Sequence, residues 1–387
     1  MNFENTEVAF KAKTSYEIKK AWLLFWLLSF PWFVGLASKV TLFLLKIQLP
    51  ITWLIRHTLY QQFCGGSNRT ECQKTVQLMA RFGVGTILDY AIEGAKTESV
   101  FDSTARELLE TINLAKGNKA IPFTVFKVTG VASHELLEKV QSKIPLSPEE
   151  KTAMDRATER VTQLCKAAYD ADVSIFIDAE ETWIQEVVDD MALSLMRKFN
   201  TKKAVVYNTL QLYRTNRIAY LKELLALAKN ESFILGLKLV RGAYMEKERA
   251  YAAAKAIASP VFDTKLETDK NYNEALKICI EQIDKVSICA GTHNQESTEL
   301  LISLMEQNKL TSSHPHIYFS QLYGMSDNLT YNLAAKDYNV SKYVPYGPVR
   351  AMMPYLFRRA EENSSIQGQT TRELELVNLE IQRRKLI

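Results

Sequence analysis

The 387-residue chain has few of the residues that mark disulfide, metal and nucleotide-loop proteins. Its five cysteines are scattered, without a CxxC pair or metal-ligand spacing, which is typical of reduced thiols. Glycine is scarce, with 14 residues, and no GxxxxGK[ST] loop is present. Gly83-Val84-Gly85 lacks the third glycine of a dinucleotide fingerprint and precedes its strand, so it indicates a turn.

The charges exclude a further class of protein. A net charge of +4 comes from mixed signs along the chain, without a basic block or interleaved aromatic residues, so we expect no nucleic-acid partner. The start, MNFENTEVAF, contains Glu4 and Glu7 and no apolar run, which indicates neither a secretory signal nor an Arg-rich transit peptide. These features predict a cytoplasmic location.

One apolar stretch is unusual for such a protein. Residues 21–38 carry no charge and just reach the length of a membrane span. Pro31 interrupts the stretch, and a second apolar piece, residues 40–55, contains Lys46. Two short apolar helices on a surface are favoured within an N-terminal helical arm, residues 1–79. Packing on the protein's own domain, peripheral contact with the inner face of a membrane, and a true span all stay open.

From about residue 80, short β-branched runs alternate with longer stretches of helical periodicity. The eight strands are expected to begin near residues 85, 121, 173, 204, 233, 286, 316 and 340. Eight such units predict an α/β fold, a (β/α)8 TIM-like barrel over residues 80–363. An open doubly wound sheet is the alternative. The tail, residues 364–387, is expected to be a solvated helix or a cover over the site.

A barrel places its active site at the carboxyl ends of its strands. Polar residues follow every predicted strand: Asp89 and Glu93, Lys127 and Thr129, Asp178 and Glu180, Gln211 and Tyr213, Lys238 and Arg241, Thr292 and His293, Gln321, and Tyr343. Any one of these could simply face solvent, but together they predict a site. Lys238 and Arg241 interrupt an apolar run, and buried cations require anions.

A second candidate set lies on the last predicted barrel helix. Tyr355, Arg358, Arg359 and Glu362 have the spacing i, i+3, i+4, i+7 and share one helix face. The face is either solvated, with an Arg358 to Glu362 ion pair, or belongs to a final helix over the barrel mouth. His314-Pro315-His316 precedes the seventh strand, at the opposite end of a barrel, so we expect no metal.

Several ordered motifs resemble the proline dehydrogenase family. They are KLVRGAY followed by Glu246-Lys247-Glu248, the THN at 292–294, the DAEE at 178–181, and YVPYGPVRAMMPYLFRRAEEN. The resemblance extends from about residue 80 to residue 363. Without an attached aldehyde dehydrogenase domain, the chain is similar to stand-alone, monofunctional members.

The resemblance implies a flavoprotein that catalyses the first step of proline catabolism. FAD would lie at the carboxyl ends of the strands, L-proline would be oxidised to 1-pyrroline-5-carboxylate by hydride transfer to flavin N5, and electrons would pass to membrane quinone. The residues implied for substrate and catalysis are Arg358, Arg359 and Lys127 at the carboxylate, Tyr343, Tyr355, Tyr244 and Leu322 as pocket walls, Asp178 near the site, and Glu93 as a latch. Those implied for the flavin are Gln211, Lys238, Arg241, Gly242, Ala243, Thr292, His293 and Asn294.

Two departures from the family pattern bear on these expectations. Lys238 stands where some members have Arg, which keeps the charge but loses the fork geometry. Gly291 stands where others often have Ala. Tyr343 favours proline over 4-hydroxyproline as substrate. The alternatives are a hydroxyproline dehydrogenase of the same fold, a Schiff-base lyase that uses Lys127 or Lys238, and a non-catalytic barrel.

Overall fold

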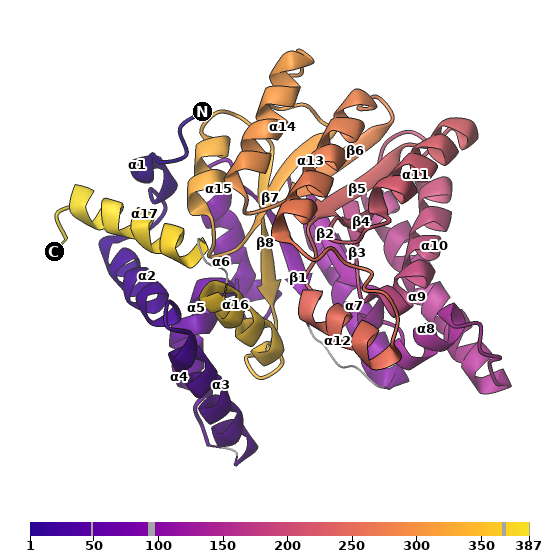
Figure 1. Ribbon diagram of the computed structural model, residues 1–387, viewed down its shortest axis with the longest axis horizontal. Coiled ribbons are helices and arrows are strands. Elements are labelled where there is room, and N and C mark those ends of the chain that lie inside the picture. Colours follow the sequence, from indigo (N-terminus) through magenta and orange to yellow (C-terminus); the bar gives the residue numbers. More distant parts are fainter. Residues whose placement is uncertain (48, 92–96, 366–368, 387) are drawn as a thin grey trace. The chain divides into compact units, whose positions relative to one another are not determined.

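The sheet is a closed barrel of eight parallel strands in chain order (Figure 1). The computed structural model describes residues 1–47, 49–91, 97–365 and 369–386. The strands are β1 (Gly85–Tyr90), β2 (Phe123–Lys127), β3 (Ser174–Asp178), β4 (Val206–Gln211), β5 (Leu235–Val240), β6 (Val286–Gly291), β7 (Ile317–Leu322) and β8 (Val340–Tyr346). The predicted (β/α)8 architecture is thus confirmed, and the open sheet is wrong.

Helices follow the strands as the periodicity predicts. The helices outside the N-terminal arm are α7 (Glu98–Ala115), α8 (His134–Gln141), α9 (Pro148–Ala171), α10 (Thr182–Phe199), α11 (Arg217–Glu231), α12 (Met245–Lys255), α13 (Lys265–Glu281), α14 (Gln295–Gln307), α15 (Asp327–Ala334), α16 (Met353–Ser365) and α17 (Gln369–Arg383). Strand β4 begins two residues later than predicted. The amide of Val205, the residue before β4, donates to Asn200 Oδ1 (3.0 Å). This hydrogen bond keeps Val205 in the loop between α10 and β4.

Aromatic rings fill part of the barrel interior. Phe123 of β2 stacks on Phe176 of β3 (4.4 Å between ring centroids) and meets Tyr318 of β7 edge-on (4.8 Å). Strands β2 and β7 are not neighbours in the barrel, so rings that touch between them must point inward. This packed layer makes the barrel a core rather than a pore.

The chain divides into two compact units, which we describe separately. The first comprises residues 1–93 and 321–387, and the second residues 94–320. In the first unit, the arm consists of α1 (Thr6–Ala9), α2 (Ser15–Leu28), α3 (Pro31–Lys46), α4 (Thr52–Ile55), a π-helical turn (Arg56–Tyr60), α5 (Gln61–Phe63) and α6 (Arg69–Ala80). Placement of the last barrel helix over the barrel mouth stays a prediction.

The apolar stretch forms two helices, but their boundary differs from the expectation. Pro31 does not interrupt a helix; it begins α3, where its missing N–H would have no helical partner. Ile18, Ala21, Phe25 and Leu28 line the buried face of α2. Among the helices that the structure describes, none alone has the length and apolar character of a membrane span. Helices α2 and α3 meet that description only as a pair, bent by 96°.

The tail is more than a solvated helix. Helix α17 lies along α2 (Figure 1), and it buries Leu376, Val377 and Ile381 in the core of the first unit. The indole nitrogen of Trp22 on α2 donates to Asn378 Oδ1 (2.7 Å). The tail therefore stabilises the N-terminal arm, with each buried aliphatic side chain contributing about 1.5–3 kcal/mol.

A buried carboxylate links three distant segments of the same unit. Asp327, at the start of α15, accepts from Lys13 Nζ (2.8 Å) and from Lys342 Nζ (2.9 Å) of β8. Lys342 is only 1% exposed. Burial raises the pKa of Asp327, but the two ammonium groups outweigh it and lower the pKa to about 2. The buried ammonium group of Lys342 is therefore satisfied by this carboxylate together with the carbonyl groups of Leu322 and Met325.

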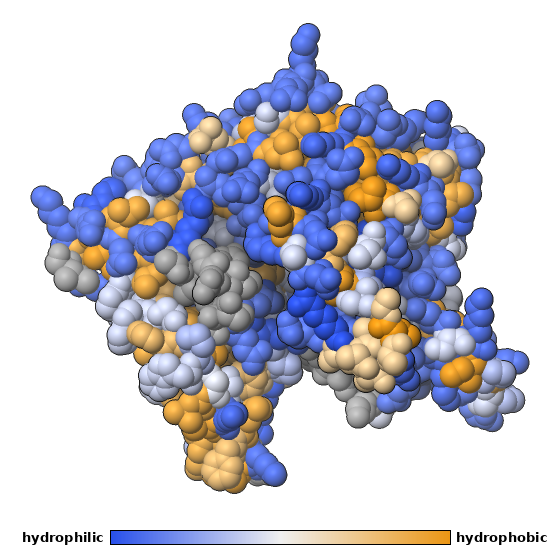
Figure 2. Space-filling view, in the orientation of Figure 1, coloured by the Kyte–Doolittle hydropathy of each residue, from blue (hydrophilic) through white to orange (hydrophobic). Residues whose placement is uncertain are grey.

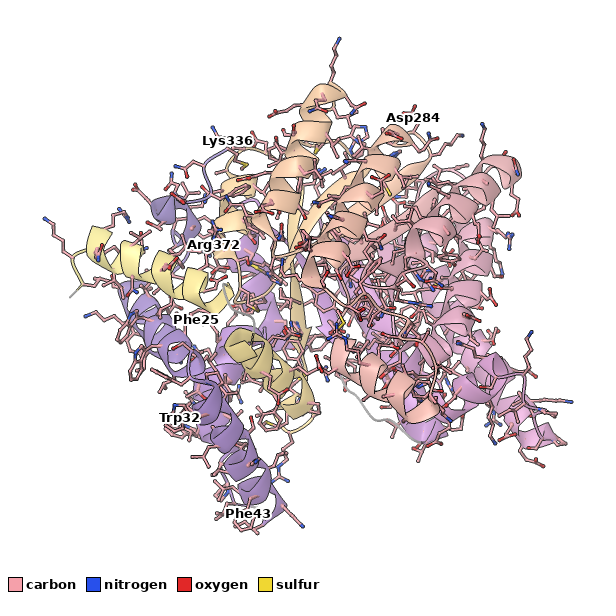
Figure 3. All side chains as sticks on the ribbon, in the orientation of Figure 1. Phe25, Trp32, Phe43, Asp284, Lys336 and Arg372 are labelled. Carbon is pink, nitrogen blue, oxygen red and sulfur yellow. The ribbon has the colours of Figure 1, made fainter. Side chains whose placement is uncertain are left out.

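We predict that Asp327→Asn lowers the free energy of unfolding by about 3–5 kcal/mol, because it leaves a buried ammonium group without its anion. Urea denaturation measures the change. Asp284→Asn is the matched control, because Asp284 is exposed (Figure 3) and its loss is expected to stay within about 0.5 kcal/mol. Because the pKa of Asp327 is depressed, its stabilisation is present above pH 3.8 and is lost as the pH falls toward 2. Equal stability of the two variants would contradict the role of Asp327.

Candidate functional site

The carboxyl end of β3 provides the anion for Lys238 of β5. Lys238 Nζ donates to Asp178 Oδ1 (2.5 Å), and Thr209 Oγ1 lies 3.5 Å from the same oxygen. Lys238 and Asp178 are 9% and 8% exposed. The register of the sheet also places Lys127 of β2 beside Asp178. These three predicted residues therefore come together at one end of the second unit.

The loop after Asp178 is held by side chains that the motif search did not assign. Glu180 is 3% exposed and accepts from the backbone N (2.9 Å) and hydroxyl (2.8 Å) of Thr129. Burial raises the pKa of Glu180, although the charge of Lys127 acts against this. The Glu180 amide donates to Gln185 Oε1 (2.6 Å). The DAEE loop is thereby fixed relative to β2 and α10.

Gln211, at the end of β4, has one bound and one unbound polar atom. Its Nε2 donates to the Glu180 carbonyl (2.8 Å), which fixes the orientation of the amide. Its Oε1 is buried and has no hydrogen-bond partner within the part of the chain that the structure describes. A buried acceptor without a donor costs about 1–3 kcal/mol, so Oε1 is suited to receive an N–H group from a ligand.

Arg241 is fully engaged by the protein itself. Its Nε donates to Asp269 Oδ1 (2.6 Å), Nη1 to Thr292 Oγ1 (2.6 Å) and Nη2 to Ser297 Oγ (2.9 Å). Its guanidinium also lies over the ring of Tyr272 (4.4 Å). Burial raises the pKa of Asp269, but hydrogen bonds from Lys265 and Arg241 hold it below the usual range. The anions beside Lys238 and Arg241 are thus protein carboxylates, which sequence spacing could not reveal.

The residues after Arg241 form a sharp turn into α12. Gly242 has φ +138°, and a side chain there would come within 2.4 Å of the ring of Tyr213, so only glycine fits. Ala243 is exposed, and Tyr244 immediately precedes the first residue of α12. Glu248, fully buried on α12, accepts from the amide (2.8 Å) and hydroxyl (2.5 Å) of Thr182. That bond ties the turn to the start of α10.

The THN motif after β6 has a clear structural role. Thr292 Oγ1 also accepts from the Asn294 amide (3.0 Å), and Asn294 Oδ1 caps α14 by accepting from the Ser297 amide (2.8 Å). His293 is half-buried between them. A cofactor role for these three residues stays a prediction.

In the first unit, the aromatic and arginine set lies on α16 and β8. Tyr355 and Arg359 are each 7% exposed and Tyr343 is 8% exposed, whereas Arg358 and Leu322 are half-buried. The expected ion pair forms from Arg359 rather than Arg358: Arg359 Nη2 donates to Glu362 Oε1, at i+3. The solvated helix face is therefore wrong, because α16 turns Tyr355 and Arg359 inward.

Two features of this set matter for binding. Burial raises the pKa of Tyr355, and among the residues that the structure describes its hydroxyl has no hydrogen-bond partner. Burial also raises the pKa of Glu362, against the charges of Arg359 and Arg358. A buried arginine beside a buried phenol offers hydrogen-bond donors for a small anionic ligand.

The remaining expectations concern Glu93, a metal site and the His314–His316 pair. Glu93, expected as a latch, lies outside the described residues. Within those residues, no group of three or more His, Cys, Asp or Glu side chains could hold a metal ion. His316 Nδ1 contacts the Ile283 carbonyl (2.8 Å), and His314 Nδ1 accepts from the His316 amide (3.3 Å). That histidine pair therefore organises a turn.

The chain is similar to proteins of one known family. The family described as proline dehydrogenase matches residues 72–372. Proline dehydrogenase 1, mitochondrial, of Dictyostelium discoideum is 32% identical over 88% of this chain and 67% of its own length. The carbapenem antibiotics biosynthesis protein CarD of Pectobacterium carotovorum is 34% identical over 83% of each chain. Hydroxyproline dehydrogenase of Xenopus laevis is 27% identical over 97% of this chain and 88% of its own.

A solved structure supports the fold. Proline utilization A from Bdellovibrio bacteriovorus, inactivated by N-propargylglycine, superposes with a TM-score of 0.72 at 19% identity. The match covers 82% of this chain but only 35% of that longer chain.

We predict that His134 titrates above pH 6.5, because the Glu181 carboxylate, 3.6 Å from its Nε2, favours the charged ring although partial burial opposes it. Burial raises the pKa of Glu181 as well, but His134 and Lys247 lower it to about 2. The stabilisation from His134 is complete below pH 6.5 and is lost as the pH rises through the pKa of His134 in the folded protein. The stabilisation from Glu181 is instead lost as the pH falls from 4.5 toward 2.

Titration of ¹³C-labelled histidine by NMR measures this prediction on five resonances. Glu181→Gln should lower the pKa of His134, whereas the exposed neighbour Glu186→Gln should leave it unchanged. The same pKa in both variants would show that Glu181 does not act on His134.

Proposed function

Since the chain belongs to the proline dehydrogenase family, we propose that it oxidises L-proline to 1-pyrroline-5-carboxylate, with FAD as cofactor and a membrane quinone as electron acceptor. The proposal rests mainly on one observation. The polar residues that resemble the family motif are buried at the carboxyl ends of β3, β4 and β5. Asp178 is paired to Lys238, and Gln211 Oε1 has no donor among the described residues. A structural ion pair alone would not leave a buried amide oxygen without a partner.

The residues present fit a flavin. Gln211 Oε1 can accept from an N–H of the flavin ring, and the ammonium group of Lys238 can favour negative charge on that ring. Bound FAD would supply the acceptor for a hydride. His293, Thr292, Asn294, Arg241, Gly242 and Ala243 would hold the cofactor through the β5 and β6 loops. Because Gly242 has no side chain, the backbone passes close to the ring of Tyr213. No side chain at position 242 would then obstruct a ligand.

The α16 residues would hold the substrate. Oxidation removes a hydride from the ring carbon beside nitrogen and a proton from nitrogen, which leaves a C=N bond. Arg358 and Arg359 would bind the carboxylate, with Lys127 as a further cation, because two guanidinium groups fix a small ring by charge-assisted hydrogen bonds. Tyr343, Tyr355, Tyr244 and Leu322 would exclude water from the apolar ring. The roles of Glu93 as a latch and Asp178 as an acid near the substrate remain predictions.

A second substrate has a specific observation in its favour. The hydroxyproline dehydrogenase of Xenopus laevis aligns with 97% of this chain. We favour proline because the family resemblance of the motif around Tyr343 implies a proline enzyme. A cytoplasmic location, peripheral on the inner face of a membrane, stays a prediction from the sequence.

We expect the purified protein to be yellow and to lose its flavin absorbance band when L-proline is added without oxygen. The band should bleach more slowly with 4-hydroxyproline. Faster bleaching with 4-hydroxyproline would move the substrate assignment to the hydroxyproline enzyme. A colourless protein that cannot take up FAD would contradict the flavin. A carbonyl substrate that borohydride traps on Lys127 or Lys238 would indicate the lysine chemistry instead.

We predict that Arg359→Met lowers kcat/KM for L-proline about 100-fold or more, because a charge-assisted pair of hydrogen bonds to a carboxylate is worth about 3 kcal/mol. Flavin content per protein should not change. Lys336→Met is the matched control, since Lys336 is an exposed cation (Figure 3) and its loss should leave kcat/KM unchanged. If both variants kept full activity, Arg359 would not bind the substrate.

A further inference from the structure

Helix α3 carries an apolar stripe on its outer side. Trp32, Leu36, Val40, Phe43 and Ile47, just beyond its end, are 69%, 55%, 45%, 60% and 50% exposed. Their spacing of four, four, three and four residues places them on one face of the helix. The labelled side chains of Trp32 and Phe43 both extend from α3 (Figure 3). Val34, on the other side, is buried in the core of the first unit. Both sides of α3 are thus apolar, and among the residues that the structure describes only one side has a packing partner.

The stripe belongs to a larger apolar surface. Of 20 large hydrophobic side chains exposed in the described chain, 11 lie between Leu23 and Leu54. Trp53 and Leu54 of α4 are 67% and 56% exposed. The space-filling view shows apolar side chains gathered over α3 (Figure 2). A contiguous exposed patch of this kind marks an interaction site. We call it the N-terminal apolar surface, defined by the exposed side chains of α3, Ile47, Trp53 and Leu54.

The charge around this surface has one sign. Residues 18–70 contain six Lys or Arg and no Asp or Glu, so all 44 carboxylates lie elsewhere in the chain. Lys39 and Lys46 follow Trp32 by seven and fourteen residues, which places them along the same side of α3. Both are exposed. Arg56 has an ion-pair partner from outside the stretch, Glu71 (2.8 Å), whereas the two lysines have none among the residues that the structure describes.

The charge distribution selects the partner. A second copy of the chain would bring the same cations together with no carboxylate in the stretch to neutralise them. Exposed Trp side chains, with an apolar body and a polar tip, and lysines beside an apolar stripe are typical of segments that lie at the boundary between lipid headgroups and acyl chains. Anionic headgroups would neutralise the lysines.

We propose that the N-terminal apolar surface docks the protein onto the anionic face of a lipid bilayer. Helix α3 lies along the interface, with Trp32 and Phe43 among the acyl chains and Lys39 and Lys46 at the headgroups. This inference stands on the surface itself, and it rests on the proposed function only for its purpose, which is to bring the enzyme to a quinone dissolved in the membrane.

Sedimentation with vesicles tests the docking. We expect the full-length protein to pellet with vesicles of phosphatidylcholine and phosphatidylglycerol, and much less with phosphatidylcholine alone. Raising the salt concentration should reduce the difference between the two, because salt screens exposed charges. Full-length protein that stays in the supernatant with both vesicles would overturn the proposal.

Exposed positions allow matched variants. The double variant Trp32→Glu with Phe43→Glu should lower vesicle binding at least about tenfold, because it places two charges in the acyl region. The control is Ile257→Glu with Leu266→Glu, which changes side chains that are 56% and 63% exposed in the second unit, and it should bind as the unaltered chain does. Circular dichroism verifies that both variants fold. Equal losses in both variants would overturn the assignment to α3.

A third pair isolates the charge. Lys39→Glu with Lys46→Glu should remove the preference for phosphatidylglycerol, while the exposed pair Lys229→Glu with Lys285→Glu should keep it. Unchanged preference in the first pair would contradict the headgroup contact.

Two other results would replace the proposal. If light scattering shows that Trp32→Glu with Phe43→Glu converts a dimer to a monomer while vesicle binding is unchanged, the surface joins copies of the chain. If alkaline carbonate fails to release bound protein, α2 and α3 cross the bilayer rather than lie on it.

Vesicle binding is measured without proline, so bound protein that does not react with proline would refute only the proposed function. Protein that bleaches with proline but does not sediment would refute only the docking.

Discussion

The ion pair between Lys238 and Asp178 is the constraint on which the site depends. Barrel closure places both groups where little water reaches them, so each charge needs the other. Asp178 is also the first residue of a loop whose other two carboxylates are committed. Glu180 binds Thr129, and Glu181 binds Lys247. Movement of the loop would break all three contacts, and this rigidity suits the hydride transfer that we propose.

A buried charge also joins distant segments in the first unit. Asp327 joins Lys13 of the N-terminal segment to Lys342 of β8. Glu373 of α17 accepts from the Ser326 amide (2.5 Å), one residue before Asp327. The two ends of the chain are thus attached to the last barrel strand at one point. The arm and the tail are integral parts of this unit, and the arm can present an apolar surface outward because its other side is anchored.

The strand ends, α16 and the arm have different properties, and together these properties suit the proposed function of a dehydrogenase that passes electrons to a membrane quinone. The strand ends hold fixed charges and one buried amide oxygen that no described residue supplies with a donor, whereas α16 holds an arginine and a phenol turned inward. Within the arm, residues 18–70 carry exposed tryptophans and lysines and contain no Asp or Glu. An enzyme that reduces a lipid-soluble acceptor needs both a dry, ordered chemical site and a surface that tolerates contact with lipid.

The sequence by itself determined the fold class and most of the residues at the strand ends. Strand and helix periodicity depends on local side-chain patterns, so the eight strands were found within about two residues of where they begin. Motif order likewise indicated Asp178, Lys238, Gln211, Arg358 and Arg359. Only the tertiary structure decided which groups pair. In the structure Asp178 pairs with Lys238, Asp269 pairs with Arg241, and Glu362 pairs with Arg359 instead of Arg358. It also placed Pro31 at the start of α3 and buried one side of α17. Partners such as Asp269 lie on a helix far along the chain, and their choice depends on how elements pack in three dimensions, for which linear spacing carries no signal.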